Sequence, residues 1–211
     1  NAKGRIMREL DRTESESGKD IQVTIDTNLQ EFSMLRMSDL SASAVVVDIK
    51  NGDINVMAST PSFNPNSIVN GISNTDWNQL LENLKRPLSN KSVSDAYPPG
   101  SLFKMIVAIT ALENKVISEY EDIICNGIYE TSASKHHCWL GSGHGKINLE
   151  KALKRSCDVY FYEIAKRVGI DAIAKTAKTF GLSQLFDLPV SAVSRGLVPD
   201  QAWKKSTYKE K

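Results

Sequence analysis

The stretch DAYPPGSLFKMIVAITALE, residues 95–113, places a serine and a lysine three positions apart at the start of an expected helix. Its Pro-Pro-Gly triplet ends any preceding helix, so a new helix is expected to begin at Ser101. Residues three positions apart lie on one face of a helix, so Ser101 and Lys104 should be in contact. A lysine that is taken out of water holds its proton less tightly, and it can then act as the base for a serine nucleophile.

The residues that follow the serine are almost all apolar from Leu102 to Leu112, the pattern of a helix buried on all sides. In many proteins S-x-x-K is only a helix cap followed by a surface lysine. A surface lysine, however, normally lies on a polar stripe, and this helix has none. The positive end of a helix dipole also favours negative charge that develops on a reacting oxygen. The pattern therefore favours a catalytic pair.

A second group of reactive residues consists of three cysteines and a histidine. Cys125, Cys138, His144 and Cys157 follow the spacing C-x12-C-x5-H-x12-C. Three thiolates and one imidazole are a standard ligand set for structural zinc, and a metal can order a glycine-rich, irregular segment such as this one. Two alternatives remain open at this stage: a Cys125–Cys138 disulfide with Cys157 buried, or three unrelated small apolar residues.

Hydrophobic patterning predicts the elements that position these groups. Two β-rich runs within residues 42–60 flank an Asn-Gly pair, the strongest short hairpin signal. Residues 44–47 are apolar at every position, so this strand is expected to be buried on both faces of its sheet. Residues 21–26 alternate like an edge strand. Helices are expected at about 27–37, 74–86, 149–155, 157–168 and 170–181.

The composition is that of an ordinary globular protein. The 211 residues are 41% hydrophobic and 24% charged, which is enough for a real core. A formal net charge of +1 offers no electrostatic basis for binding nucleic acid or a membrane surface. The longest apolar run, Met105–Leu112, is far shorter than the about 20 residues that a bilayer span needs.

Four stretches, in this order along the chain, resemble the transpeptidase domain of the class B penicillin-binding proteins and most closely the elongation-type members. AVVVDIKNGDINVMASTPSFNPN resembles the strand and hairpin that precede their first active-site motif, and PPGSLFKMIVAITALE resembles that motif. RSCDVYFYEIAKRVGID resembles their second motif, S-x-N or S-x-D, and GLVPDQAWKK the stretch that follows. The resemblance implies an α/β (α+β) fold of the penicillin-binding protein and serine β-lactamase type, with an antiparallel central sheet covered by helices.

The same resemblance implies a catalytic role for four residues and no cofactor for catalysis. Ser101 would attack the penultimate D-alanine carbonyl of a stem peptide, and Lys104 would take the serine proton. Ser156 would relay a proton to the leaving amine, and Asp158 would hold Lys104 and the substrate amide. β-Lactams would mimic the D-Ala-D-Ala amide and stop at the acyl stage. From the residues alone, Ser156 and Asp158 are a helix N-cap and an acidic first turn, and this interpretation is compatible with the catalytic one.

The resemblance also bears on the metal. Elongation-type relatives carry acidic, His and Cys ligands around this loop, with the histidine in a GHG turn that matches Gly143–Gly145. This match selects His144 over His136 and His137 as the ligand. Neighbouring residues on a helix point about 100° apart, so Cys157 can face away from the cleft while Ser156 faces into it.

The third motif of the family, Lys-Thr/Ser-Gly, does not occur in this sequence. We therefore expect a fragment, incomplete at the C-terminus and impaired in activity. Residues 1–20 would be the end of a non-catalytic N-terminal module with its linker, and residues 21–211 the N-terminal part of the transpeptidase domain. The alternatives are a non-catalytic penicillin-sensing domain and a serine β-lactamase. A deacylating glutamate is not found in a loop after the second motif, which weighs against the β-lactamase.

The cellular setting follows from the same resemblance. Stem peptides are crosslinked on the periplasmic side of the bacterial inner membrane, so the protein is expected there, tethered only through an N-terminal anchor that this sequence lacks. Its expected partners are peptidoglycan stem peptides, β-lactam antibiotics, and the elongation machinery with a polytopic glycosyltransferase. A nucleic-acid partner is not expected.

Overall fold

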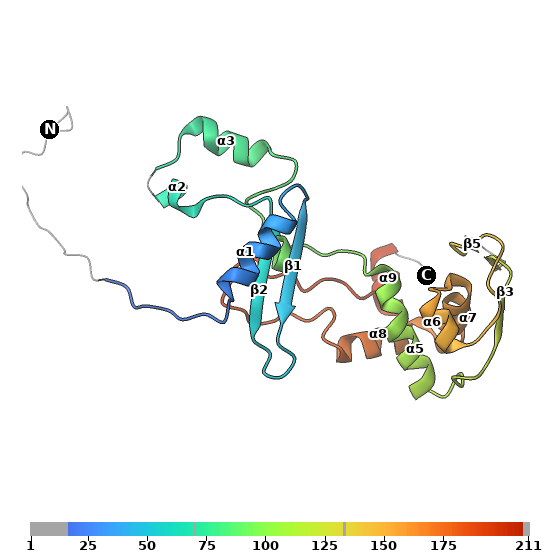
Figure 1. The fold of residues 1–211 in the computed structure, drawn as a ribbon. Coiled ribbons are helices and arrows are strands. Elements are labelled where there is room, and N and C mark those ends of the chain that lie inside the picture. Colours follow the sequence, from blue (N-terminus) through green and yellow to red (C-terminus); the bar gives the residue numbers. More distant parts are fainter. Residues whose placement is uncertain (1–16, 70, 133, 209–211) are drawn as a thin grey trace, which may run out of the picture. The chain divides into compact units, whose positions relative to one another are not determined.

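The computed structural model describes residues 17–69, 71–132 and 134–208, and the chain divides into two compact units, Asn1–Leu88 and Ser89–Lys211 (Figure 1). Residues 1–16, within the predicted N-terminal module and linker, lie outside the described residues. Among the described helices, none is both long enough and apolar enough to cross a bilayer.

The first unit is built on the predicted hairpin. Strand β1 (Ala42–Val47) pairs antiparallel with β2 (Ile54–Thr60), and helix α1 (Thr27–Arg36) packs against β2 (Figure 1). The α1 helix begins where the Asp26 carboxylate accepts a hydrogen bond from the Leu29 backbone N–H at 2.9 Å. The Gln30 side-chain amide then forms two hydrogen bonds with the Met57 backbone, at 3.0 and 2.9 Å, and so fixes the helix to the strand.

Two predictions for this unit are wrong. Residues 45–47 of β1 are between 39% and 47% exposed, and the buried residues of the hairpin lie on β2, at Val56, Ala58 and Thr60. Residues 21–26 do not form a strand, since their backbone joins the hairpin only where Asp26 N–H donates to the Asn55 carbonyl at 3.0 Å. The unit is completed by α2 (Pro65–Val69) and by α3 (Asn74–Glu82), which confirms the predicted surface helix.

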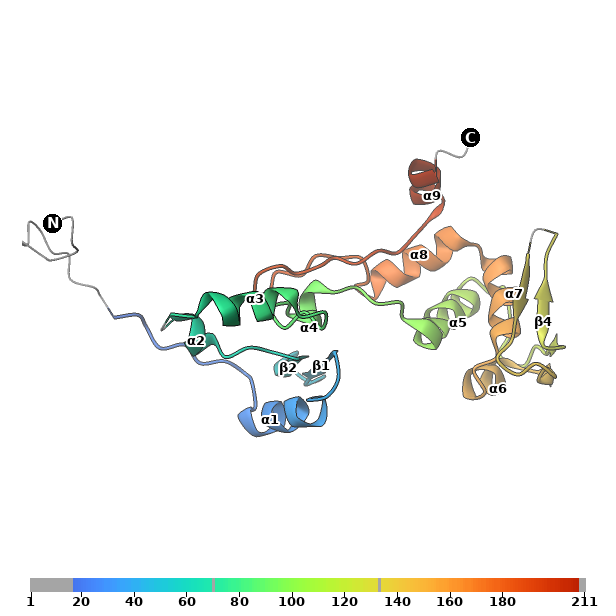
Figure 2. The ribbon, with the colours of Figure 1, turned by 90° about the horizontal axis from the view of Figure 1, so that it is seen from above.

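The second unit has a helical core formed by α5 (Phe103–Glu113), α6 (Leu149–Lys154), α7 (Asp158–Val168) and α8 (Ile170–Thr179). Figures 1 and 2 show α5 beside α7 and α8, which the contacts between these helices support. Fully buried alanines allow the close approach; these are Ala111, Ala152 and Ala177. Shorter elements are α4 (Lys91–Ser94) and a 3-10 turn, η1 (Gly100–Leu102). Helix α9 (Gln201–Tyr208) was not predicted.

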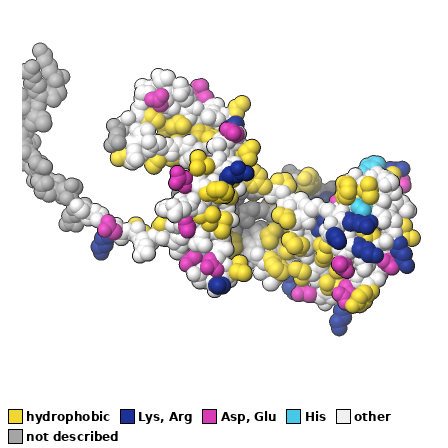
Figure 3. Space-filling model, viewed as in Figure 1, with side chains coloured by type: hydrophobic (Ala, Val, Ile, Leu, Met, Phe, Trp, Pro, Cys, Tyr) yellow, Lys and Arg dark blue, Asp and Glu magenta, His cyan; other side chains and the backbone are white. Residues whose placement is uncertain are grey.

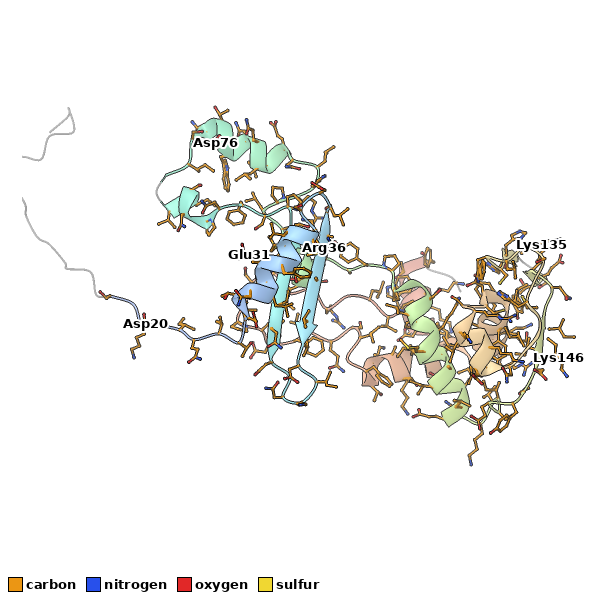
Figure 4. The ribbon with its side chains drawn as sticks, in the orientation of Figure 1. Asp20, Glu31, Arg36, Asp76, Lys135 and Lys146 are labelled. Atoms are coloured by element: carbon orange, nitrogen blue, oxygen red, sulfur yellow. The ribbon has the colours of Figure 1, made fainter. Side chains whose placement is uncertain are left out.

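Two antiparallel strand pairs lie along α7 and occupy the segment that the sequence predicts to be irregular. Strand β3 (Ile123–Cys125) pairs with β6 (Gly145–Ile147), and β4 (Ile128–Glu130) pairs with β5 (Lys135–His137). Figure 4 shows Lys135 and Lys146 on these strands pointing outward from the unit. The face of the unit seen in Figure 3 mixes charges of both signs with histidine and apolar side chains. The strands therefore cover α7 and present an outer surface of mixed polar and apolar character.

Candidate active site

Ser101 and Lys104 lie in contact, as the sequence predicts, but the helix begins later than expected. Ser101 is the middle residue of the 3-10 turn η1, and α5 itself starts at Phe103. Lys104 is in the first turn of α5, and its Nζ lies 3.3 Å from Ser101 Oγ. The helix is not buried on all sides, because Met105 and Leu112 are 51% and 40% exposed. One side of α5 therefore packs on the core, and Ser101 and Lys104 lie together at its N-terminal end.

Ser156 is brought to this pair by a tight turn between α6 and α7. Its φ is +50°, in the left-handed region that costs a non-glycine residue about 1–2 kcal/mol. Backbone hydrogen bonds hold the turn, from Ser156 N–H to the Leu153 carbonyl at 3.1 Å and from Cys157 N–H to the Ala152 carbonyl at 2.9 Å. Ser156 Oγ then lies 2.9 Å from Ser101 Oγ. Ser156 is therefore not the helix cap; Cys157 occupies that position, and Asp158 is the acidic first-turn residue.

Lys104 Nζ is the centre of the site. It donates to Ser156 Oγ and to the Ser156 carbonyl, both at 2.9 Å, and it forms an ion pair with Asp158 Oδ1 at 2.6 Å. The Lys104 side chain is 13% exposed, and its Nζ lies 5.7 Å from the centre of the Phe161 ring. The surroundings expected from the sequence were apolar, but those observed are largely polar. A serine hydroxyl next to an amine and a second hydroxyl can lose its proton to them when it attacks a carbonyl.

The structure also brings together the four predicted metal ligands. Cys125, Cys138, His144 and Cys157 are all buried, their ligand atoms lie within 4.8 Å of one another, and the three cysteines are free thiols. His144 Nδ1 lies 3.6 Å from Cys125 Sγ and 3.5 Å from Cys138 Sγ. Tetrahedral zinc with its usual bond lengths would separate sulfur and nitrogen ligands by about 3.6 Å. The four residues therefore fit zinc in both ligand type and spacing.

Two glycines allow this cluster to close. Gly127 and Gly143 have φ values of +86° and +77°, which favour glycine. A Cβ at Gly127 would lie 2.1 Å from the Gly141 carbonyl oxygen, and a Cβ at Gly143 would lie 2.1 Å from the Cys125 carbonyl oxygen. The backbone segments that carry Cys125 and His144 can therefore cross only with glycine at these two positions.

The thiols differ in how the protein stabilises their charge. Burial raises the pKa of the Cys138 thiol, but hydrogen bonds from the backbone N–H groups of Leu140, Asp158 and Val159 outweigh burial, so the pKa lies below its ordinary value. Burial raises the pKa of Cys157 to about 12. Backbone donors to a sulfur are the kind of outer contact that supports a metal thiolate. Asp158 therefore contacts the Cys/His cluster through its backbone N–H and is also one of the catalytic candidates.

The remaining histidines and one tryptophan complete the surroundings. His136 and His137 lie exposed on β5, outside the cluster, which fits the prediction of His144 as the ligand. Trp139, which the sequence analysis missed, donates its backbone N–H to Asp158 Oδ2 at 3.1 Å. The only signal for it in the sequence is its position directly after Cys138. A cavity of about 650 Å³ lined by residues such as Tyr97, Pro99 and Phe103 lies nearby, but none of the four catalytic candidates lines it.

Comparison with known proteins decides the family. The penicillin binding protein transpeptidase domain family matches residues 42–210, four fifths of the chain. The chain belongs to this family. It is 33% identical to the peptidoglycan D,D-transpeptidase MrdA of Acinetobacter baumannii over 213 residues, which cover 100% of this chain and 32% of that protein. The MrdA protein of Escherichia coli K12 is 32% identical over 212 residues, which cover 100% of this chain and 34% of the relative.

Solved structures of this transpeptidase family give the same result for the fold. Pseudomonas aeruginosa PBP2 in complex with WCK 5153 superposes with a TM-score of 0.86 and 34% identity, covering 92% of this chain and 44% of that one. Helicobacter pylori PBP2 in complex with MreC has a TM-score of 0.83 and 34% identity, covering 88% of this chain and 35% of that one. The predicted fold is thereby confirmed, while the chain spans about a third of the length of the curated relatives it matches.

Proposed function

We propose that the protein is a peptidoglycan D,D-transpeptidase that crosslinks stem peptides through a serine acyl-enzyme and is acylated by β-lactams. The observation that carries this proposal is the position of Lys104 Nζ, within hydrogen-bond distance of Ser101 Oγ, Ser156 Oγ and Asp158 Oδ1. These three partners come from two segments more than 50 residues apart. The relatives named D,D-transpeptidases support the same activity.

In the acylation step, Ser101 Oγ attacks the carbonyl of the penultimate D-alanine, and Lys104 in its amine form takes the hydroxyl proton. The bond to the terminal D-alanine nitrogen breaks, and Ser156 gives its proton to that leaving amine. Ser156 regains a proton from Lys104, at 2.9 Å. Asp158, at 2.6 Å from Nζ, keeps the lysine in place through these transfers.

In the second step, an amine of a neighbouring stem peptide attacks the ester carbonyl of the acyl-enzyme. The attacking amine gives up a proton to Ser156, and Lys104 returns a proton to Ser101 Oγ as the ester bond breaks and takes one from Ser156. The new amide is the crosslink. A β-lactam follows the first step only, because its leaving amine stays tethered to the acyl group. The resulting ester is expected to be long-lived.

The lifetime of that ester separates a transpeptidase from the alternatives. Incubation with a fluorescent penicillin should give one covalent label per chain, and the label should persist for hours after free drug is removed. Rapid release of hydrolysed penicillin would indicate a serine β-lactamase instead. A persistent label without crosslinking of stem peptides would indicate a non-catalytic penicillin-sensing domain, and failure of the full-length protein to label would contradict the proposal.

The family's Lys-Thr/Ser-Gly motif does not occur in these 211 residues. We further propose that the strand carrying this motif is needed for full activity. The 211-residue chain by itself should then acylate much more slowly than a transpeptidase domain of this family that contains the motif. Equal second-order acylation rates in a stopped-flow comparison would contradict this. We also propose that residues 1–20 belong to an N-terminal module and linker, as the sequence predicts.

The Cys125, Cys138, His144 and Cys157 cluster is proposed to hold one structural zinc. A bound zinc would link β3, the following loop and the start of α7 to one another, and it would take part in no step of catalysis. His144→Ala should lose the metal and lower the melting temperature, while His137→Ala, an exposed histidine on β5, should change neither. Elemental analysis with a count of free thiols decides, and a metal-free protein with two oxidised cysteines would contradict the proposal.

The cellular role proposed is peptidoglycan synthesis during elongation, on the periplasmic side of the inner membrane. The relatives named MrdA and the structure of H. pylori PBP2 with MreC support it. The partners proposed are the elongation machinery, including an MreC-type protein and a polytopic glycosyltransferase. Co-purification of the full-length protein with these components from membranes would test the assignment.

A further inference from the structure

Trp139 makes polar contacts on both sides of the Ser156 turn. Its side chain is well exposed, at 65% for the whole residue, yet both of its N–H groups are engaged. The backbone N–H donates to Asp158 Oδ2 at 3.1 Å, and the indole Nε1–H donates to the Arg155 carbonyl at 2.9 Å. Arg155 precedes Ser156 and Asp158 follows it by two residues, so one residue holds both ends of the turn.

The first contact fixes the catalytic carboxylate. Asp158 Oδ1 faces Lys104 Nζ at 2.6 Å, and Oδ2 faces the Trp139 N–H. A carboxylate held through both oxygens cannot rotate freely, so its distance to the lysine is set by the backbone at Trp139. Hydrogen bonds to a charged acceptor are among the stronger ones in proteins.

The second contact stabilises the strained turn. Ser156 adopts a left-handed φ of +50°, and such a conformation persists only when its surroundings hold it. The Arg155 carbonyl is the peptide oxygen directly before that residue, and the indole N–H holds it in place. This backbone conformation brings the Ser156 carbonyl and hydroxyl within hydrogen-bond distance of Lys104 Nζ.

Trp139 is itself held by the Cys/His cluster. It follows Cys138 directly, and its ring packs edge-on against the His144 ring, with centres 5.4 Å apart. The cluster therefore fixes the backbone of the residue that orients Asp158.

We propose that Trp139 is a positioning residue for acylation, which connects the Cys/His cluster to the Lys104, Ser156 and Asp158 group through its two N–H donors. This inference rests on the proposed function, because acylation is the reaction that it serves. The indole bond is the part that a side-chain substitution can remove, since any residue but proline keeps the backbone N–H.

The test compares Trp139→Phe with Trp203→Phe, a control in α9 whose ring packs against Tyr208 at 6.0 Å. Phenylalanine keeps an aromatic ring against His144 and loses only the indole donor. The full-length protein is titrated with a β-lactam, and the non-covalent Kd is separated from the acylation rate constant. We expect Trp139→Phe to lower the rate constant about tenfold with Kd changed less than about twofold. Metal content and melting temperature should match those of the control.

An unchanged rate constant in Trp139→Phe would overturn the proposal, as would a fall in rate accompanied by loss of metal or of melting temperature, because either result leaves only a structural role. A second measurement does not depend on acylation. Exchange of the Trp139 indole proton should be at least about tenfold slower than in an unstructured peptide, and Asp158→Asn should shift the Trp139 backbone amide resonance. Unprotected exchange with no shift would contradict the contacts themselves, whether or not the protein labels with penicillin.

Discussion

Lys104 Nζ has four oxygen atoms within 3.3 Å, those of Ser101, Asp158 and two of Ser156. An ammonium group has only three protons to donate, so these four acceptors compete for them. The hydroxyl of Ser101 is the most distant of the four and also contacts Ser156 Oγ at 2.9 Å. At the scale of single residues, Lys104 is therefore the group that we propose to control proton transfer in the site.

Replacing Lys104 by alanine should lower the second-order rate of β-lactam acylation at least about 1,000-fold, because the nucleophile loses its base and Asp158 loses its counter-ion. Lys178→Ala serves as the control, since that lysine pairs with Asp200 at 3.0 Å on a different part of the unit. Its acylation rate should stay within about twofold of wild type. A Lys104→Ala rate within tenfold of wild type would remove the lysine from the mechanism.

The contact of Ser101 with Lys104 could be predicted from the sequence because it depends only on helical spacing. The orientation of Ser156 could not, since it arises from a left-handed φ that local patterns assign to glycine rather than serine. Trp139 was missed for a related reason. Its contact with Asp158 uses a backbone N–H, which every residue except proline carries, so the residue type gives little signal for that contact.

At the scale of elements, the crossing of Gly127 and Gly143 determines whether the Cys/His cluster forms. We predict that Gly143→Ala lowers the free energy of unfolding by about 2–4 kcal/mol, from the left-handed φ and from the clash with the Cys125 carbonyl. The variant should also lose bound metal. Gly141→Ala is the matched control, because a Cβ there meets no atom within 4 Å. Chemical denaturation and metal analysis of the two variants provide the test, and equal stability would contradict the crossing.

Helix α7 is anchored by a second, charged contact. Arg167 pairs with Glu163 at 2.8 Å and with Glu121 at 2.6 Å, and Glu163 also accepts from Tyr129 Oη at 3.2 Å. The hydrogen bond from Arg167 lowers the pKa of Glu163, although burial opposes this. A lowered carboxyl pKa contributes stability above the unfolded value of about 4.3, and this contribution is lost as the pH falls through the folded pKa.

Glu163→Gln should therefore destabilise the protein at pH 7 by about 0.5–1 kcal/mol, a range that allows for partial exposure of the pair. The difference from wild type should shrink as the pH falls and disappear below the folded pKa of Glu163, where both forms are uncharged at this position. Glu130→Gln is the control, because its pair with Lys135 is exposed and should contribute less. A difference that persists unchanged at low pH would show that the carboxylate charge is not responsible.

The elements were predicted unevenly, for physical reasons. The hairpin and helices α7 and α8 follow from turn chemistry and from apolar periodicity that extends over ten or more residues. Strands β3 to β6 have three residues each, too few to establish a period. The predicted burial of β1 was wrong, because an apolar run shows only that a strand can be buried. Whether it is buried depends on the elements that pack against it.

At the scale of the whole molecule, the candidate catalytic group depends on chain topology. Ser101 and Ser156 are 55 residues apart, and helix packing in the second unit brings their hydroxyls to 2.9 Å. Residue patterns alone could not predict this contact. The family resemblance could, because the order of the motifs along the chain is shared by proteins of the same fold. The match over residues 42–210 shows that this order is that of the transpeptidase domain.

We propose that Ser101 is the nucleophile that penicillin acylates. The most direct test is intact-mass spectrometry of the full-length protein after incubation with benzylpenicillin, followed by peptide mapping of the adduct, for wild type and Ser101→Ala. We predict one adduct of the mass of penicillin on the peptide that contains Ser101, stable for hours, and none in Ser101→Ala. An adduct on another residue, or labelling of Ser101→Ala at the wild-type rate, would contradict the claim.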